Sequence, residues 1–122
     1  MEAIRQGINY FDTAYVYKNN EKVLGRILAE NNCRDQIYIA TKLPQYMVRS
    51  VAQAEKIFNQ ELELLQTDHI DYYLMHMLND LASWNRLKAW GLRIGSRRKW
   101  PAERFEISVF PITAIPRILS QL

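Results

Sequence analysis

The chain has 122 residues, of which 48% are hydrophobic and 24% charged, and it carries a formal net charge of +3. This length allows one ordinary domain, and the composition excludes a disordered chain or a membrane-spanning bundle. The single cysteine, Cys33, excludes a disulfide framework and a cysteine-based zinc site within the chain.

The first residues predict the end of a helix followed by a strand. Residues 1–6 have helical character, and Gly7 stands where a left-handed C-terminal cap is favoured. A chain that starts at the end of a helix predicts that part of a longer fold is missing before Met1. Residues 1–6 also lack the apolar core of a signal peptide, which predicts a cytoplasmic location and no membrane partner. The apolar segment Ile8–Phe11 predicts a strand that stops at Asp12.

A helix and a second strand follow. From about Asn20, apolar residues recur at helical spacing, and Asn31 and Asn32 break the pattern. The segment Gln36–Ala40 is β-branched and aromatic in character, which predicts a strand. Pro44 forbids this strand from continuing in a central position of a sheet.

The next helix has the clearest signal in the chain. Ser50 and Gln53 form a capping-box pair, in which the hydroxyl accepts from a first-turn amide and the Gln side chain reaches back. An apolar face follows at helical spacing, made of Val51, Ala54, Phe58, Leu62 and Leu65.

The alternation of strands and helices predicts the fold class. Residues 67–69 predict a turn, residues 70–75 a third strand that ends at His76, and residues 81–88 a further helix. Such alternation indicates an α/β fold with a parallel sheet and right-handed crossovers. In a parallel barrel the strand ends meet at the C-terminal rim, where barrel enzymes have their active sites. A flavodoxin-like or Rossmann sheet would also gather them, but no Gly-x-Gly-x-x-Gly motif follows these strands.

Three of the predicted strands end in side chains that suit proton transfer. Asp12, Lys42 and His76 each follow a strand and lie about one βα unit apart. A free phenol has a pKa near ~10 and is a weak general acid at neutral pH, but a nearby ammonium group lowers that value. Tyr17 could then protonate a developing alkoxide with Lys42 beside it. Asp12 could orient Lys42, and His76 could hold a carbonyl oxygen.

These motifs resemble the aldo-keto reductase family, whose members are NADP-dependent (β/α)8 barrels. The resemblance is carried by GINYFDTAYVY with the Asn-Glu pair that follows, by ATKLP around Lys42, and by IDYYLMH ending at His76. It implies that Asp12, Tyr17, Lys42 and His76 are the catalytic tetrad and that Asp12 also contacts the cofactor. None of these groups supplies a hydride, so the reduction needs a nicotinamide, NADP(H) by resemblance. The implied substrate is a small carbonyl compound.

One branch of the family is favoured. Residues 58–79 and Trp84 resemble the bacterial and archaeal members whose longer forms carry a C-terminal iron–sulfur domain. The chain itself offers no ligand set for a metal or a cluster, so we expect neither in it.

Several residues have plainer interpretations. Tyr15 and Tyr17 are neighbours on one turn, and only the family spacing selects Tyr17. His69 is expected to cap or to face solvent. Glu21 is expected in the first turn of its helix, where a negative charge is favourable to the helix dipole. Three aromatic residues are expected in the core rather than in a site: Tyr72, Tyr73 and Trp84.

The resemblance stops after about Lys88. The residues beyond it contain most of the excess positive charge, but no nucleic-acid-binding motif surrounds it, and we expect no nucleic-acid partner. The coding DNA can also be considered in a shifted reading frame, in which each codon takes the third base of one residue's codon and the first two bases of the next. In that frame, codons that encode residues 94–114 can also encode the peptide WIEKKMAGGKIRNIGFSYHG. That peptide resembles the family's next helix and strand. The sequence therefore predicts a partial barrel over residues 1–88 and an out-of-frame, poorly ordered tail over residues 89–122.

The predicted fold is thus a partial (β/α)8 TIM barrel of about three βα units with an unpatterned C-terminal tail. A complete barrel needs roughly 250 residues, and a part of one leaves open sheet edges. We expect an NADPH-dependent carbonyl reductase by resemblance, with weak or no activity in this chain and a tendency to self-associate through those edges. The alternative is a non-catalytic partial barrel, either a pseudogene product or an interaction module.

Overall fold

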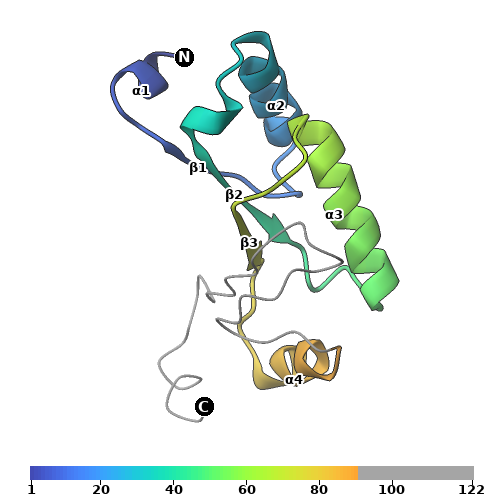
Figure 1. Ribbon diagram of the computed structural model, residues 1–122. Coiled ribbons are helices and arrows are strands. Elements are labelled where there is room, and N and C mark those ends of the chain that lie inside the picture. Colours follow the sequence, from blue (N-terminus) through green and yellow to red (C-terminus); the bar gives the residue numbers. More distant parts are fainter. Residues whose placement is uncertain (91–122) are drawn as a thin grey trace.

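A three-stranded parallel sheet forms the centre of the structure (Figure 1). The computed structural model describes residues 1–90. The strands lie in the order β1-β2-β3, and both neighbouring pairs are parallel. This arrangement confirms the predicted α/β fold. In chain order the elements are α1 (Glu2–Arg5), β1 (Tyr10–Asp12), α2 (Asn20–Glu30), the 3-10 helix η1 (Arg34–Gln36), β2 (Tyr38–Leu43), α3 (Val51–Leu65), β3 (Tyr72–Met75) and α4 (Leu81–Ala89).

The strands are shifted from their predicted ranges. β2 begins at Tyr38 rather than at Gln36, because the Gln36 amide donates back to the Cys33 carbonyl and closes the turn of η1. β2 also continues to Leu43, and Pro44 then ends it as predicted. Two of the predicted site residues therefore move relative to their strands. Lys42 lies within β2 rather than after it, and Asp12 is the last residue of β1.

Alternation along β2 divides the sheet into two faces. Ile39 and Leu43 belong to the hydrophobic core, and Thr41 between them hydrogen-bonds to side chains of α2 and α3. We call this side the covered face, and Figure 1 shows α2 and α3 lying next to each other along it. The opposite side, which we call the open face, carries Tyr10 and Tyr38, each about half exposed.

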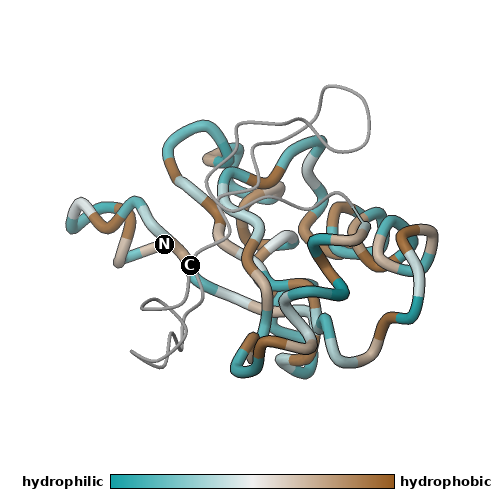
Figure 2. The backbone as a smooth tube through the Cα atoms, turned by 90° about the horizontal axis from the view of Figure 1, so that it is seen from below, coloured by the Kyte–Doolittle hydropathy of each residue, from teal (hydrophilic) through white to brown (hydrophobic). Residues whose placement is uncertain are grey.

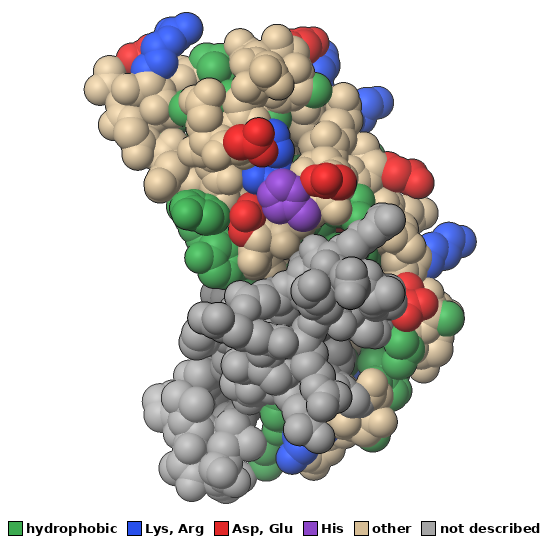
Figure 3. Space-filling view, in the orientation of Figure 1, with side chains coloured by type: hydrophobic (Ala, Val, Ile, Leu, Met, Phe, Trp, Pro, Cys, Tyr) green, Lys and Arg blue, Asp and Glu red, His purple; other side chains and the backbone are tan. Residues whose placement is uncertain are grey.

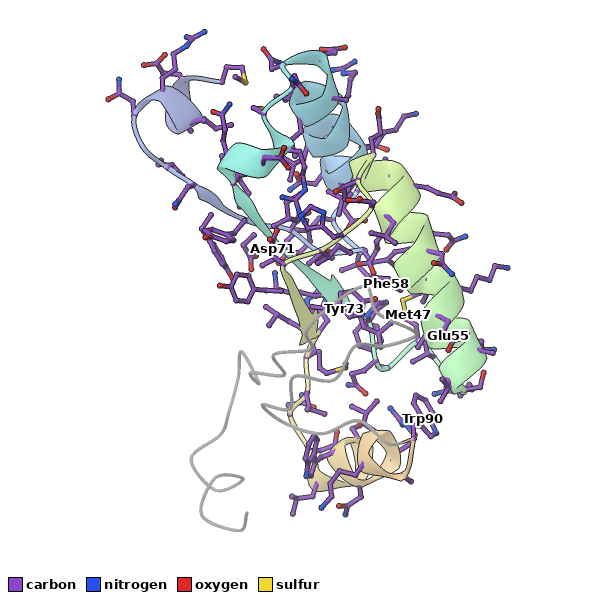
Figure 4. All side chains as sticks on the ribbon, viewed as in Figure 1. Met47, Glu55, Phe58, Asp71, Tyr73 and Trp90 are labelled. Carbon is purple, nitrogen blue, oxygen red and sulfur yellow. The ribbon has the colours of Figure 1, made fainter. Side chains whose placement is uncertain are left out.

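Close packing holds the two helices of the covered face together. Phe58 on α3 meets Tyr73 on β3 edge to face, with ring centroids 5.1 Å apart (Figure 4). Gly25 of α2 lies against the C-terminal end of α3. A Cβ atom at this position would clash with the Leu64 carbonyl oxygen and would lie 2.5 Å from the Leu65 carbonyl carbon. Glycine is therefore what lets α2 approach the α3 backbone this closely.

The helix ends follow from local chemistry. The Ser50 hydroxyl accepts from the Gln53 amide at 3.3 Å, which confirms the predicted N-cap of α3. The Gln53 side chain reaches back as predicted, but to the Arg49 amide at 2.7 Å. Asp80 caps α4 by accepting from the Ser83 amide at 2.7 Å, a cap that the sequence analysis missed. Gly7 has a φ of 89°, as expected of a left-handed residue after α1.

Arg34 joins the segments that lead into β2 and β3. Its guanidinium donates to the Thr67 hydroxyl at 2.9 Å, to the His69 carbonyl at 3.0 Å and to Asp71 at 2.7 Å. The same Asp71 oxygen accepts from the Ile39 amide at 2.8 Å. The side chains of Arg34 and Asp71 are 16% and 19% exposed, so this ion pair is largely shielded from solvent. We call these residues the Arg34 clamp.

The hydrophobic residues occur in short segments. In Figure 2 they recur along the strands and helices and do not form one long run. Within residues 1–90, no helix has the length and the apolar character needed to cross a bilayer.

Candidate active site

Lys42 lies at the centre of the candidate site on the open face. Its ammonium donates to an Asp12 carboxylate oxygen on the neighbouring strand and to the Thr13 carbonyl at 2.8 Å. The pairing of β1 with β2 sets Asp12 beside Ala40, so Lys42 is two residues further along the same face. The Lys42 side chain is 5% exposed, whereas that of Asp12 is 47% exposed. The pair therefore joins a buried cation to a half-hydrated carboxylate.

Tyr17 lies over this ion pair. The Tyr17 amide donates to the Ala14 carbonyl at 2.9 Å, and this turn carries the phenol ring back over the end of the sheet. The Lys42 ammonium lies 5.2 Å from the centre of the Tyr17 ring, and the phenol is 41% exposed. Tyr15 points elsewhere, since its hydroxyl donates to Gln60 on α3 at 3.2 Å. The residues alone did not decide between Tyr15 and Tyr17, and the geometry shows that only Tyr17 lies beside Lys42.

His76 completes the group. It follows β3 directly, and its amide donates to the Leu43 carbonyl of β2 at 2.8 Å. Its ring meets the Tyr17 ring edge to face, with centroids 6.0 Å apart. Burial lowers the pKa of His76, and the positive charge of Lys42 lowers it further, so the imidazole is neutral at neutral pH. The structure therefore brings Asp12, Tyr17, Lys42 and His76 together at one end of the sheet.

A small cavity lies behind the tyrosine turn. Its volume is about 90 Å³. Tyr15, Tyr17 and Glu21 line it together with Asn19, Lys22 and Leu64. Glu21 is thus a neighbour of the turn that carries Tyr17, although it belongs to the other face of the sheet.

The expected position of Glu21, in the first turn of α2, is confirmed, but the sequence analysis did not foresee that its side chain is buried. We expected a first-turn charge in favourable contact with the helix dipole, but Glu21 is only 2% exposed and accepts from the Thr41 hydroxyl at 2.6 Å. The same hydroxyl lies 3.0 Å from Glu61 of α3, which is fully buried. The reason is the packing of α2 against α3, which turns the first turn of α2 inward.

The sequence analysis missed Glu61. The sequence pattern that could have identified it is an acidic residue within the apolar face of a helix. Glu61 lies three residues after Phe58 and four before Leu65. Such a position is buried when the stripe faces a sheet, and a buried carboxyl group needs partners.

His69 lies away from the tetrad, in the segment that leads into β3. It is partly exposed, as expected, and its Nδ1 atom is 2.6 Å from Asp68. Its Nε2 atom is 4.0 Å from Asp71. Figure 3 shows a histidine with acidic and basic side chains around it on the face in view. Within residues 1–90, no cluster of three or more histidine, cysteine or acidic side chains could hold a metal ion.

The three aromatic residues expected in the core divide between the faces. Tyr73 and Trp84 are buried, as expected. Tyr72 is only partly buried and lies on the open face, where its ring is 5.5 Å from that of Tyr10 and 6.2 Å from that of Tyr38.

The parallel strands, with helices over one face and polar side chains at one end, form part of a (β/α)8 TIM barrel. Solved barrels align with this arrangement. The aldo/keto reductase from Brucella melitensis does so with a TM-score of 0.61 and 25% identity, over 98% of this chain and 46% of that one.

The chain belongs to the aldo/keto reductase family, whose model matches residues 1–90. D-galacturonate reductase from Fragaria ananassa is 30% identical over 125 residues, which cover 94% of this chain and 34% of the relative. An aldo-keto reductase from Klebsiella pneumoniae, solved in complex with NADPH, aligns with a TM-score of 0.57 and 27% identity, over 73% of this chain and 33% of that one. The chain spans less than half the length of these relatives.

Proposed function

We propose that residues 1–90 carry the proton-transfer group of an aldo-keto reductase, which reduces a small carbonyl compound to an alcohol with NADPH. One observation carries the proposal. The ammonium of Lys42 is held by Asp12 on one side and faces the Tyr17 ring on the other, with His76 against the same ring. A cation near a phenol favours the phenolate form, and this supports a role for Tyr17 as general acid.

Each side chain has a separate task in this proposal. Tyr17 donates its phenolic proton to the carbonyl oxygen as that oxygen becomes an alkoxide. Lys42 stabilises the phenolate that remains, and Asp12 keeps the ammonium in place. His76, as a neutral imidazole, donates a hydrogen bond to the carbonyl oxygen and adds no charge to the site.

The cofactor supplies the hydride when it is bound. Asp12 fits a role beside the nicotinamide, because its carboxylate is half exposed at the end of β1 while it also holds Lys42. The chain spans only part of its relatives, so the remaining cofactor contacts are expected on strands that residues 1–90 do not include.

The first test is an NADPH-oxidation assay of the 122-residue chain with D-galacturonate, the compound in the strawberry relative's name, and with simple aldehydes. We expect turnover at or near background, because three βα units cannot close a barrel. Robust turnover would show that the chain is a competent reductase and would overturn this expectation.

The second test supplies the rest of the barrel. Residues 1–90 are joined to the matching later strands of a relative, and Tyr17→Phe is compared with Tyr15→Phe in the same chimera. We expect Tyr17→Phe to lower kcat by about 10²- to 10⁴-fold and Tyr15→Phe to lower it far less. A folded chimera in which both variants are equally active would sink the assignment of Tyr17.

A second candidate function is a non-catalytic partial barrel that associates through its sheet edges. It is favoured by the position of β1 and β3, which are the two outer strands among the described residues. Unpaired edges bind other strands readily. Sedimentation of the purified chain over a range of concentrations tests it, and a monomer at all concentrations would exclude it.

Three finer proposals rest on the sequence. We propose that the reading frame changes after about residue 88, that the intact gene belongs to the branch with a C-terminal iron–sulfur domain, and that the protein is cytoplasmic. The family model matches residues 1–90 only, which supports the first of these, whereas the alignments with the Fragaria and Brucella proteins continue beyond residue 90 and weigh against it. Sequencing the DNA across this point tests it. If the shifted frame does not encode the peptide that resembles the family's next helix and strand, the change of frame is excluded. Of the predicted tail, residues 89–122, Ala89 is the last residue of α4, and residues 91–122 lie outside the described residues.

A further inference from the structure

Two carboxyl groups are buried together on the covered face. Glu21 comes from α2 and is 2% exposed, and Glu61 comes from α3 and is fully buried. The Thr41 hydroxyl of β2 lies between them, 2.6 Å from Glu21 Oε1 and 3.0 Å from Glu61 Oε1. The Tyr73 hydroxyl of β3 lies 2.5 Å from Glu61 Oε2. We call these four side chains the carboxyl cluster.

Among the described residues, no cation neutralises the carboxyl cluster. Within residues 1–90, the ion pairs formed by lysine, arginine and histidine side chains involve neither Glu21 nor Glu61. Lys42 is the residue next to Thr41, but alternation along β2 turns it to the open face, where it donates to Asp12. Two buried carboxylates side by side would each lose hydration and would repel each other.

Counting hydrogens shows what the carboxyl cluster needs. Tyr73 gives its one hydroxyl hydrogen to Glu61 Oε2, and Thr41 has only one to give. Thr41 cannot donate to Glu21 and to Glu61 at once, yet both oxygens lie within hydrogen-bond distance of it. A proton on either Glu61 Oε1 or Glu21 Oε1 satisfies both contacts with Thr41, whereas Glu21 Oε2 is buried without a hydrogen-bond partner among residues 1–90. We place the proton on Glu61, the more deeply buried of the two. Glu61 then donates to Thr41, and Thr41 donates to Glu21.

The electrostatics point to the same proton. Burial raises the pKa of Glu61 to about 9, and the negative charge of Glu21 contributes to the rise. Burial raises the pKa of Glu21 as well, but its hydrogen bonds with Thr41 and Glu61 act in the opposite direction. The titratable groups that face Glu61 are Glu21 from α2 and Tyr73 from β3, and neither brings a positive charge.

We propose that Glu61 is a neutral carboxylic acid at neutral pH and that its hydrogen bond to Thr41 makes it a positioning residue for Lys42, the next residue of β2. The hydrogen-bond chain ties α3, β2 and α2 together at Thr41, and the next residue of the strand carries the ammonium of the candidate site. Glu61 itself touches none of the reacting groups. The importance of Lys42 rests on the proposed function, whereas the proton on Glu61 does not.

Infrared spectroscopy of the 122-residue chain tests the proton directly. A protonated carboxylic acid has a carbonyl stretch that carboxylates lack. We expect this band at pH 7 in the wild type, its loss in Glu61→Gln, and its retention in Glu63→Gln, an exposed position on the same helix. Absence of the band in the wild type would overturn the proposal. So would its loss in Glu21→Gln with retention in Glu61→Gln, since the proton would then belong to Glu21.

The positioning role has a readout of its own. We expect the backbone amide signals of Thr41 and Lys42 to shift with pH, with an inflection near the pKa of Glu61, about 9, and we expect Glu61→Gln to remove it. Glu61→Gln keeps both hydrogen bonds, because its amide can donate to Thr41 and accept from Tyr73. Identical titrations of both signals in the wild type and the variant would overturn the positioning role. Neither experiment uses NADPH or a substrate, so failure of the proposed function would leave both results interpretable.

Discussion

Thr41 and Lys42 are neighbours on β2, yet they serve two polar clusters that stabilise carboxyl groups in opposite ways. On the open face, Asp12 is half exposed and is paired with the ammonium of Lys42. On the covered face, Glu61 is fully buried and has hydroxyl groups as partners. The depth of burial decides the outcome. A half-hydrated carboxylate can keep its charge beside a cation, whereas a fully buried one without a cation takes up a proton.

The two clusters also have different roles, one in the candidate site and one in holding the helices against the sheet. The open-face cluster keeps its charges close to solvent, where a substrate can reach them. The carboxyl cluster joins four elements, α2, α3, β2 and β3, and none of its side chains reaches the candidate site. The following substitutions test whether the two faces are as different as the structure indicates.

Gly25→Ala should have the largest effect on stability, because it prevents α2 from packing against α3 on the covered face. The new methyl group would clash with the backbone of α3, which cannot move away without separating the helices. We expect a loss of about 3 kcal/mol or more in the free energy of unfolding, measured by urea denaturation.

The sign of that effect is informative. Helix propensity alone predicts that Gly25→Ala stabilises the protein by up to about 1 kcal/mol. Arg26→Ala, at an exposed position of the same helix, is the control and should change stability by about 0.5 kcal/mol or less. A stabilised Gly25→Ala variant would mean that α2 does not pack against α3 as described.

Thr41→Val should come next. Valine has nearly the same shape but no hydroxyl, so Glu21 loses its donor and Glu61 loses one partner, both inside the protein. We expect a loss of about 2–3 kcal/mol, measured in the same way. A loss of less than about 0.5 kcal/mol would show that the carboxyl cluster is open to water.

The pH dependence of stability should differ in sign between the two faces. The pKa of Glu61 is raised in the folded state, so the unfolded chain releases this proton first, and stability falls as pH rises from about 4.5 to about 9. The slope can reach at most about 1.4 kcal/mol per pH unit. The pKa of His76 is lowered by burial, so stability also falls as pH drops below 6.5.

Thermal unfolding between pH 4 and 9 measures both trends. Between pH 6.5 and 9, Glu61→Gln should flatten the profile and His76→Asn should leave it unchanged. Below pH 6.5 the two effects oppose each other, so the two substitutions should change the slope in opposite directions. A His76→Asn variant that also flattened the profile between pH 6.5 and 9 would show that the two clusters titrate as one.

Lys42→Met should have the smallest effect on stability. It leaves Asp12 without its cation, but that side chain is 47% exposed and water can replace the ammonium. Methionine also removes the ammonium that folding has to bury, and the charge left behind is half exposed, so we expect a change of about 1 kcal/mol or less. In a completed barrel the same variant should abolish most of the activity. A loss of stability as large as that of Thr41→Val would contradict the contrast between the faces.

Much of the fold followed from local patterns in the sequence. The order of strands and helices, the N-cap of α3 and the left-handed Gly7 all depend on residues close together in the chain. The strand limits were less accurate. β2 extends through Lys42 because Asp12 and Thr13, which belong to another segment, satisfy the ammonium.

The candidate site could be predicted only in part. Polar residues at strand ends located three of its members, Asp12, Lys42 and His76. The resemblance selected Tyr17 over Tyr15, and in the structure the turn directs the two rings to different sides. Glu21 and Glu61 could not be interpreted correctly in isolation. Each becomes buried only when α2 and α3 pack against β2, and that depends on the contact of Gly25 with the end of α3, which joins two helices far apart in sequence.

The Arg34 clamp implies a gradient of local opening along the sheet. It fixes the approaches to β2 and β3 through a shielded ion pair, and the Ile39 amide is bonded to Asp71 within it. Amide hydrogen exchange depends on local opening, which costs most where several groups must separate together. The Ile39 amide should therefore exchange slowly, and exchange should quicken toward the ends of the strands that carry Lys42 and His76. The end of the sheet that holds the candidate site would then be the one that opens first.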